Sequence, residues 1–393
     1  MNQQKALAIR ATRLDAADAE ALAEFHRQAW HASTPDSGDT GDSTAGAKKI
    51  GSTQGCPFTA SLPAPAVAVY NGAQIVGYLS SIPAEFWNGT GAIPAHWLKG
   101  FMVLESHRNG PIGFMLVKRM LEEVGTSGAM VVAPNARRLL EALGLKDAGA
   151  VPNYVTVARP VRFLRALDVE KLGLASLPAA LRGVLRTTRI APVALLCGAA
   201  ASCALGAIAL VGKLRSVGLR ARITAEPPPE SAVDGLWERL RPHLNFAPSR
   251  SGAYITWRYA GENSSRYEYI SLYSGTRLRA LAVVRVAERA DDPRLAGLRL
   301  GLIVDLVLDP TDRPAAVAAL LAARSWGRRK GCDAILLTLS HGGVGRLAIK
   351  VGYARIPGNV HCLLRARDGA LSGPEEGLER SWLTRGDAWG DDI

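Results

Sequence analysis

Residues 96–105, HWLKGFMVLE, run directly into residues 106–125, SHRNGPIGFMLVKRMLEEVG, and these two stretches decide the fold. The first is mostly apolar and is bounded by turn residues, so it predicts a buried strand. In the second, a turn at residues 108–113 comes before apolar residues at helical spacing, which predicts a helix. A strand, a glycine-containing turn and a helix in this order indicate an α/β fold.

The turn at residues 108–113 has the chemistry of an anion site. The first N–H groups of a helix lack acceptors within the helix, and the helix dipole adds positive charge at that end. Gly113 would let a phosphate approach the main chain, and Arg108 would add a charged donor. An ordinary strand-to-helix turn that contains glycine is the alternative interpretation of the same residues.

The neighbouring sequence predicts further elements of a small α/β domain. Asn71-Gly72 separates two β-rich runs, which predicts a hairpin because glycine adopts the positive φ of a tight turn. The polar stretch at 33–60, rich in Ser, Thr, Gly and Asp, predicts a flexible loop. The remaining patterns predict helices at 14–30 and 135–145 and a strand at 128–134.

A similar order of elements recurs from about residue 223. Helices are predicted at 231–244, 313–331 and 342–357, and strands within 255–288, at 298–310 and at 333–340. This suggests an internal structural repeat, although the two halves share little letter-by-letter similarity. The turn after residues 298–310 contains Asp309 and Asp312 and no glycine, and the two carboxylates would repel a phosphate.

The segment between the halves is basic and apolar. Residues 161–222 contain ten Lys or Arg and two acids, Asp168 and Glu170, and so hold +8 of the net charge of +12. Within them, residues 191–212 carry no charge and are long enough to cross a bilayer. A membrane span, a membrane-surface or re-entrant helix, and a helix buried between domains remain open. Because the charge brackets an apolar run and does not cover a folded face, we expect no nucleic-acid partner.

The five cysteines contain no CxxC pair, and an odd number argues against a disulfide framework. No His/Cys cluster has the spacing of a zinc site, so no metal is expected. The chain's first residues are too polar for a signal peptide. These features favour a cytoplasmic protein, peripheral at the inner face of the membrane if residues 182–222 contact lipid.

Residues 8–160 resemble the GNAT acyltransferase superfamily in their order of elements. In that family the strand at residues 96–105 would be the fourth, and the turn after it would bind the pyrophosphate of acetyl-CoA through an Arg/Gln-x-x-Gly-x-Gly/Ala pattern. Arg108 matches the first position and Gly113 the last, whereas Pro111, which has no N–H, replaces the middle glycine. The resemblance implies an acyl-CoA site made of Val103, Arg108, Asn109, Gly110, Ile112, Gly113 and Asn135.

The family's usual acid, a tyrosine before a Gly-Phe pair, is absent from its place. The corresponding pair is Gly144-Leu145, and Leu140 stands at the tyrosine position. Attack on a thioester also requires a base that removes a proton from the acceptor. The candidates for catalysis are Glu105, Glu85 and His96, and each could equally be a structural or solvated residue.

The second half resembles GNAT-like proteins of bacterial exopolysaccharide and envelope-glycan biosynthesis. The resemblance rests on WRY…RYEY (257–259 and 266–269) and on the tail SWLTRGDAWGDD (381–392), in which Trp382, Gly386 and Asp387 match a W…GD ending. It implies sugar-binding roles for Trp257, Arg258, Tyr259 and Asp387. Core packing of the aromatic residues is the alternative.

Together these patterns predict a mixed α/β protein with two GNAT-like domains, each a mixed central sheet flanked by helices. The domains are 1–160, with the acyl-CoA site, and 223–393, acceptor-binding or degenerate, with a helical hydrophobic connector at 161–222. The predicted activity is transfer of an acetyl or other acyl group from acyl-CoA to an amine or hydroxyl of a sugar or glycan precursor. Alternatives are a tandem-GNAT aminoacyltransferase of cell-wall precursors and a non-catalytic, membrane-associated scaffold.

Overall fold

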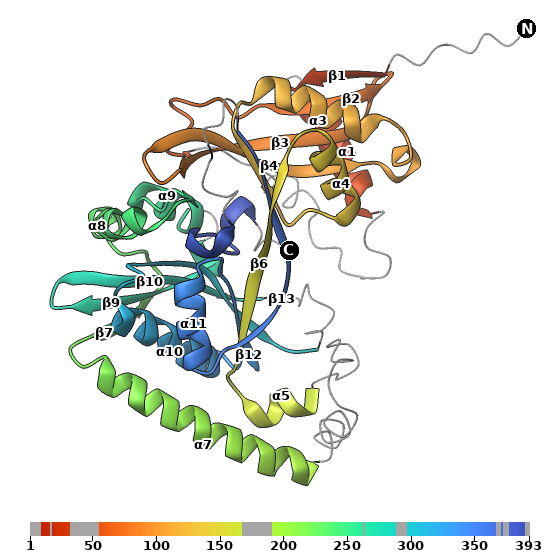
Figure 1. The fold of residues 1–393 in the computed structure, drawn as a ribbon. Coiled ribbons are helices and arrows are strands. Elements are labelled where there is room, and N and C mark those ends of the chain that lie inside the picture. Colours follow the sequence, from red (N-terminus) through yellow and green to blue (C-terminus); the bar gives the residue numbers. More distant parts are fainter. Residues whose placement is uncertain are drawn as a thin grey trace, which may run out of the picture. The chain divides into compact units, whose positions relative to one another are not determined.

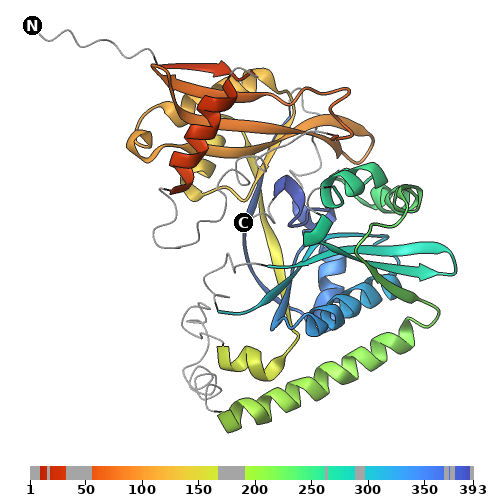
Figure 2. The same cartoon turned by 180° about the vertical axis from the view of Figure 1, so that it is seen from behind.

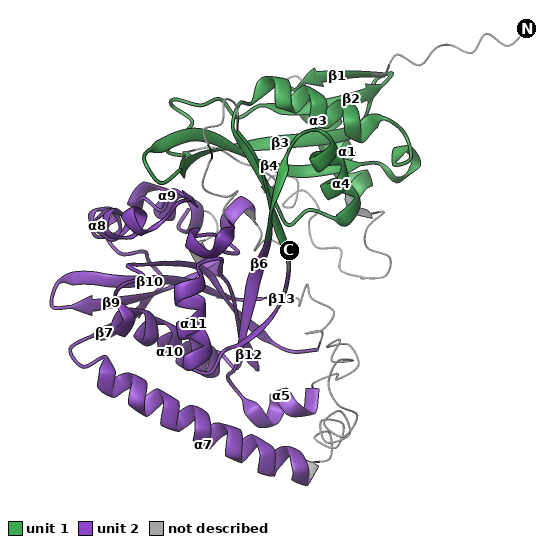
Figure 3. Cartoon of the chain, viewed as in Figure 1, with its two compact units in different colours: residues 1–149, 360–375 green, residues 150–359, 376–393 purple. Residues whose placement is uncertain are grey.

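The computed structural model describes residues 9–15, 18–31, 55–166, 191–261, 264–287, 297–366, 371 and 377–389. The chain is divided into two compact units (Figure 3). Unit 1 comprises residues 1–149 and 360–375, and unit 2 comprises residues 150–359 and 376–393. The fold is mixed α/β, as the sequence predicts. Most of the predicted loop at 33–60 and of the stretch at 162–190 lies outside the described residues.

Unit 1 contains a six-stranded run of the sheet with helices on both faces (Figures 1 and 2). Ile112 and Leu116 of α3 pack at Gly77, whereas Phe25 of α1 packs against the adjacent Tyr78, whose side chain points to the opposite face. The strands follow the order β1 (Ile9–Arg13), β2 (Ala66–Asn71), β3 (Gln74–Trp87), β4 (Ala92–Val103), β5 (Ser127–Met130) and β13 (Ala354–Arg365), of which residues 360–365 belong to this unit. The helices are α1 (Ala19–His31), α3 (Ile112–Glu123) and α4 (Pro134–Ala142).

Local sequence signals in unit 1 are confirmed. The β2–β3 hairpin turns at Gly72, whose φ of +67° is open to glycine at little cost. The predicted strand at 96–105 is the second half of β4, and α3 follows it. A bulge interrupts the β3–β4 register beside Gly100, whose φ is +68°.

Unit 2 also contains six strands in a mixed arrangement. Its strands follow the order β6 (Lys146–Val157), β12 (Ala334–Thr338), β11 (Leu300–Leu308), β10 (Arg277–Val286), β9 (Glu268–Ser274) and β7 (Arg220–Thr224). The helices are α5 (Pro160–Ala166), α7 (Ala191–Arg215), α8 (Glu230–Leu240), α9 (Gly252–Tyr259), α10 (Arg313–Arg329) and α11 (Gly342–Lys350).

Two sequence predictions in the second half are wrong. The strand expected at Ile255–Tyr259 is part of helix α9, because the Ser251 hydroxyl caps it by accepting from the Tyr254 N–H and one helical face is buried. The helix expected to run to residue 357 ends at Lys350, where Gly352 at φ +92° turns the chain into β13. β-branched and aromatic residues favour strands in general, and here tertiary packing overrides them.

Helix α7 confirms a helix over the apolar residues 191–212. Of the described helices, it alone is long and apolar enough to cross a membrane, over Pro192–Arg215. It is part of unit 2, where one side of it packs on α5 and α10 (Figure 1).

Candidate functional site

The N-terminal end of α3 is open. A short 3-10 turn, Glu105–His107, and the bend after it connect β4 to Pro111, and no side chain caps the helix. The first helical bond runs from the Met115 N–H to the Pro111 carbonyl at 3.0 Å. The N–H groups of residues 112–114 therefore have no acceptor within the helix, and they form the donor set that an anion would use.

The residues around this end fit an anion site, except that Pro111 lacks an N–H. Arg108 is exposed, and its Nε donates to the Val103 carbonyl at 3.2 Å, which holds the guanidinium beside the turn. A Cβ on Gly113 would lie 3.1 Å from Leu139 and 3.2 Å from Phe101, so glycine fits the tight packing there. Pro111 removes one N–H from the set. Asn109 and Gly110 are exposed in the same bend, and Asn135 is exposed in the first turn of α4.

Strands β4 and β5 part before β4 reaches this turn. They run parallel and are partners only at His96–Ser127 and Trp97–Gly128, whereas β4 continues to Val103. Gly128 makes room for the Trp97 ring at the last pair, where a Cβ would come within 3 Å of it. Backbone N–H and C=O groups that face such a gap need partners, and an extended ligand with amide groups can supply them.

Two buried polar atoms without partners lie where the strands part. The His96 Nδ1 and the Ser127 Oγ have no hydrogen-bond partner in the described part of the chain, and the two residues are register partners. The His96 Nε2 lies 2.8 Å from the Pro63 carbonyl and donates to it in the neutral ring. Burial lowers the pKa of His96, and the contact with Pro63 opposes this only in part. His96 is therefore neutral near pH 7, with Nδ1 as an available acceptor.

The three predicted catalytic residues lie at different ends of β4. Glu85, half-buried in β3, pairs with Pro94, two residues from His96, so Glu85 and His96 share a face with Cα atoms ~7 Å apart. Glu105 is exposed in the 3-10 turn, next to the proposed phosphate end. The structure thus brings His96 and Glu85 together and places Glu105 away from them. Leu140, at the family's tyrosine position, is a buried core residue.

Unit 2 offers an internal comparison, because its parallel pair β11–β12 also parts. The two strands are partners from Leu300–Ala334 to Ile303–Leu337, and β11 continues to Leu308. The chain's own tail fills this gap. The Gly386 N–H donates to the Val304 carbonyl at 2.8 Å, the Trp382 indole N–H to the Leu306 carbonyl at 2.6 Å, and Thr384 bridges to Leu339.

The N-terminus of α10, the helix after β11, is capped by a side chain, whereas the N-terminus of α3 is not. The Asp312 carboxylate caps α10 by accepting from the Ala315 N–H at 3.2 Å, and it also forms an ion pair with Arg279. A bound carboxylate already supplies the negative charge that a phosphate would bring. This geometry accounts for the difference between RNGPIG and DPTDRP in the two halves.

The predicted sugar-binding residues belong to a buried polar cluster of unit 2. Asp387 accepts from the Arg250 Nη2 at 2.7 Å, and Arg250 also donates to Asp305 at 3.0 Å. The Tyr259 hydroxyl donates to Asp305 at 3.1 Å, and Arg258 is buried above the Tyr259 ring. Only Trp257 of the four keeps partial exposure.

Sequence reasoning missed Ser127 and Arg250. Neither has a local signal, because each acquires its importance from a strand or tail distant in the chain. No three His, Cys, Asp or Glu side chains are placed to hold a metal ion in the described ranges.

Solved structures share this fold. No family model matches the chain, and no curated protein matches it. A GCN5-related N-acetyltransferase from Anabaena variabilis aligns with a TM-score of 0.53 and 13% identity over 92% of this chain and 73% of its own. A probable N-acyltransferase from Enterococcus faecalis aligns with a TM-score of 0.56 and 9% identity over 93% and 74%. N-myristoyltransferase from Saccharomyces cerevisiae, solved with myristoyl-CoA, aligns with a TM-score of 0.51 and 12% identity over 91% and 79%. At these identities the likeness is one of fold.

Proposed function

We propose that this GNAT-fold chain transfers an acyl group, acetyl in the simplest case, from acyl-CoA to an amine or hydroxyl of a sugar or glycan precursor. One arrangement carries the proposal: the uncapped N-terminus of α3, the parting of β4 from β5 after Trp97–Gly128 and the buried, unpartnered Nδ1 of His96 all occur along β4 and the turn that follows it. Unit 1 is the acyl-CoA unit in this proposal, and unit 2 is the acceptor-binding or degenerate one.

The residues of unit 1 fit the parts of acyl-CoA in order. The N–H groups of residues 112–114 and the Arg108 guanidinium would hold the diphosphate. From Val103 back to Trp97 the strand spans ~20 Å, along which the amide groups of the pantetheine arm can pair with β4. The thioester would then lie near His96 and Ser127, where the strands meet. When bound, acyl-CoA supplies the activated acyl group.

His96 provides the proton acceptor. Its Nε2–H is held by the Pro63 carbonyl, so the neutral tautomer presents Nδ1 as the base. Nδ1 would take the proton from the attacking amine or hydroxyl, and Glu85 on the same face would stabilise the resulting imidazolium. The leaving thiolate would recover its proton from His96 or solvent, since Leu140 offers none.

The acceptor part of the proposal rests on the resemblance of the second half to envelope-glycan proteins. Trp257 retains an accessible part, and a ring of this kind can stack on a sugar. The buried Arg250–Asp387 pair supports the proposal indirectly, because it anchors the tail whose W…GD residues carry the resemblance.

Calorimetric titration of the full chain with acetyl-CoA tests the cofactor site. Replacing Arg108 with Ala should weaken binding ~10-fold, the size expected when one charge-assisted contact to phosphate is lost. The matched control is Arg119→Ala on α3, because Arg119 is paired with Glu122 and Glu123 and faces away from the turn. An unmodified protein that does not bind at millimolar acetyl-CoA would remove the proposal.

A second assay separates the alternatives. Purified protein, acetyl-CoA and a panel of amino sugars are followed by the release of free thiol. Thiol release with a sugar supports acyl transfer, and CoA binding without turnover on any acceptor favours the scaffold. Steeply salt-dependent binding of aminoacyl-tRNA, with no response to acetyl-CoA, would favour the aminoacyltransferase.

A further inference from the structure

The outer side of α7 is an apolar surface. Six of the eight large apolar side chains that are exposed in the described ranges lie between residues 195 and 217. Leu196, Leu210 and Leu214 are 74%, 61% and 66% exposed. Their spacing of fourteen and four residues places them on one side of the helix, together with the exposed Cys203. We name this surface, formed by Leu195, Leu196, Cys203, Leu210, Val211 and Leu214, the outer face.

The opposite side of α7 is fixed to unit 2. Ala194, Gly198, Gly212 and Ser216 are buried at helical spacing. Gly198 lies against Val161 of α5 and Gly212 against Leu321 of α10, so closely that neither position has room for a Cβ. The Ser216 hydroxyl lies 3.2 Å from the Pro314 carbonyl. In an amphipathic helix at a membrane surface, a polar side faces away from the lipid. In α7 the corresponding side is apolar and is covered by α5 and α10.

The elements around α7 carry a single sign of charge. Within their bounds, α5, α7, β7 and α10 contain ten Lys or Arg and no Asp or Glu. The absence of acids is unusual, because the whole chain has 35 acids against 47 Lys and Arg. The ten are Arg162, Arg165, Lys213, Arg215, Arg220, Arg222, Arg313, Arg324, Arg328 and Arg329.

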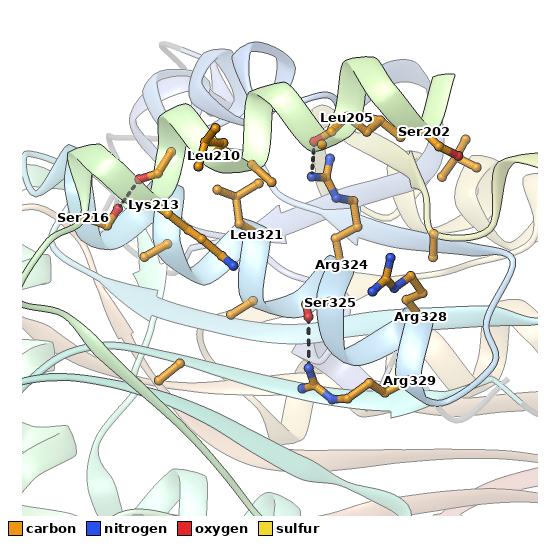
Figure 4. A pocket seen from close by; sticks show the side chains of 18 of the residues that line it. Ser202, Leu205, Leu210, Lys213, Ser216, Leu321, Arg324, Ser325, Arg328 and Arg329 are labelled. Atoms are coloured by element: carbon orange, nitrogen blue, oxygen red, sulfur yellow. Dashed lines mark hydrogen bonds between the residues drawn. The ribbon is translucent and has the colours of Figure 1, made fainter. Parts of the chain in front are cut away.

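A groove of about 1400 Å³ beside α7 gathers seven basic side chains and no acidic one. Figure 4 shows Lys213 of α7 reaching toward α10, from which Arg324, Arg328 and Arg329 project. Arg324 donates to the Leu205 carbonyl at 2.9 Å and Arg329 to the Ser325 hydroxyl, whereas no partner of Lys213 or Arg328 lies in the described residues. The apolar remainder of the wall includes Leu205, Leu210 and Leu321. Positive charge and apolar surface are thus presented by the same part of unit 2.

We propose that α7 lies in the plane of an anionic bilayer surface, with the outer face among the acyl chains and the surrounding basic residues at the lipid phosphates. This combination of an apolar helix face with flanking Lys and Arg is what anionic membranes bind. The partner is the headgroup layer of a membrane rich in acidic phospholipid. The proposal is independent of acyl transfer, because it uses no residue of the β4–β5 site.

The packing of α7 distinguishes this arrangement from a membrane span. A span would either separate Gly198 from α5 and Gly212 from α10, or keep these contacts and bring the basic groups of α10 into the hydrocarbon layer. In the plane of the surface, both sets of contacts are kept. Only the outer face, which the described part of the chain leaves exposed, then meets lipid.

Co-sedimentation of the full chain with vesicles tests the proposal. Vesicles of phosphatidylcholine with phosphatidylglycerol should bind the protein, and pure phosphatidylcholine vesicles should bind it weakly. Leu196→Glu or Leu214→Glu should lower binding ~10- to 100-fold, because a carboxylate is costly among acyl chains. The matched control is Ile349→Glu, since Ile349 is 48% exposed on α11, away from the outer face. Arg215→Glu with Arg220→Glu should abolish the preference for anionic vesicles, whereas Lys350→Glu should not.

Cys203 offers a direct probe of depth. In a Cys197→Ser background, Cys203 is the remaining exposed cysteine of the described residues. A polarity-sensitive fluorophore on Cys203 should shift to the blue with anionic vesicles, and lipid-borne quenchers should reach it. Fluorophore emission that is unchanged by vesicles would overturn the proposal. So would equal binding of the glutamate variants, or a dimer in scattering measurements that Leu214→Glu converts to monomer, which would assign the outer face to a second copy of the chain.

Discussion

At the scale of the residue, the decisive feature is the unpartnered Nδ1 of His96. Replacing His96 with Gln keeps an N–H donor for the Pro63 carbonyl and removes the proposed base. We expect kcat to fall ~100- to 1000-fold while KM for acyl-CoA changes little, as is usual for loss of a general base. The acid limb of the pH–rate profile should also disappear. The rate of thiol release, measured between pH 5 and pH 9, gives both kcat and the pH–rate profile.

His26→Gln is the matched control for this variant. His26 is also buried, and burial lowers its pKa, but it packs against Tyr78 on the α1 side of unit 1. Its replacement should leave kcat within about twofold of the unmodified chain. If the His96 variant retains full kcat and its pH profile, Glu85 becomes the base to test.

The lowered pKa of His341 predicts that the folding stability of the chain depends on pH. The Nδ1 of His341 accepts from the Val344 N–H at 3.2 Å and caps α11, and burial together with the nearby Arg346 charge lowers its pKa to about 4. The unfolded chain binds a proton at this residue below its ordinary pKa of about 6.5, whereas the folded chain does so only near pH 4. Folding stability contributed by His341 is therefore complete above pH 6.5 and is lost as the pH falls toward 4.

Urea unfolding of the unmodified chain and of His341→Asn measures this contribution. Asn keeps an acceptor for the cap and does not titrate. Between pH 7.5 and pH 5 the unmodified chain should lose about 2 kcal/mol more than the variant. Equal losses would show that the histidine does not titrate differently on folding.

The sequence points to His96 as a candidate residue and gives no signal at Ser127, its register partner. Histidine is chemically conspicuous in any strand, whereas a serine in SGAM is unremarkable until β5 is paired with β4. In the same way, the sequence marks Tyr259 and Asp387 by their chemistry, but only the fold joins them in one buried cluster with Arg250 and Asp305.

At the scale of the element, two parallel strand pairs differ in what enters the gap between them. The β11–β12 gap contains residues 382–386 of the chain itself, held by backbone and indole N–H groups on β11 carbonyls. A gap between two parting parallel strands can thus be filled by a segment that donates hydrogen bonds to the carbonyl groups of the longer strand. In the proposed function, a ligand pairs with the corresponding part of β4, which lies beyond Trp97.

The tail's role is tested by Gly386→Ala. A Cβ at this position would overlap the Tyr259 hydroxyl and would lie 3.2 Å from Val304. We expect a loss of about 1–3 kcal/mol in the free energy of unfolding, the usual effect of overpacking. Gly206→Ala is the control, because nothing lies within 4 Å of its Cβ position in α7 and alanine favours a helix. Thermal unfolding that leaves Gly386→Ala unchanged would mean that the tail is not needed for stability.

Helices and strands with strong local sequence signals are predictable from the sequence. Those whose conformation depends on packing against distant parts of the chain are not. Apolar periodicity, Gly72 and the turn before α3 predicted their elements in unit 1. By contrast, α9 is rich in β-branched and aromatic residues, and its burial against α8 and the polar cluster decides its conformation. The predicted helix at 342–357 includes residues 354–357, the start of β13, because apolar residues continue past Gly352.

At the scale of the whole molecule, the chain order of the two halves is not the order of the two units. Residues 360–375 follow most of unit 2 in sequence but belong to unit 1, where Cys362–Arg365 pair with β5 (Figure 3). Leu363 is fully buried in the core of unit 1. No periodicity within one strand reveals such a distant partner, so the predicted boundaries at 160 and 223 differ from the division into the two units.

A fragment of residues 1–160 should therefore fold poorly by itself. It lacks Leu363 and leaves an unpaired edge on β5, whose four residues are buried in the complete chain. An exposed apolar edge strand favours aggregation, and the missing core side chain costs about 2–5 kcal/mol. Joining residues 354–375 to the fragment through a flexible linker should restore a monomer with cooperative thermal unfolding. The same fusion with Leu363→Asp is the control and should behave like the short fragment. A fragment of residues 1–160 that is monomeric and as stable as the fusion would show that unit 1 does not need β13, and that the domain boundary lies where the sequence pattern places it.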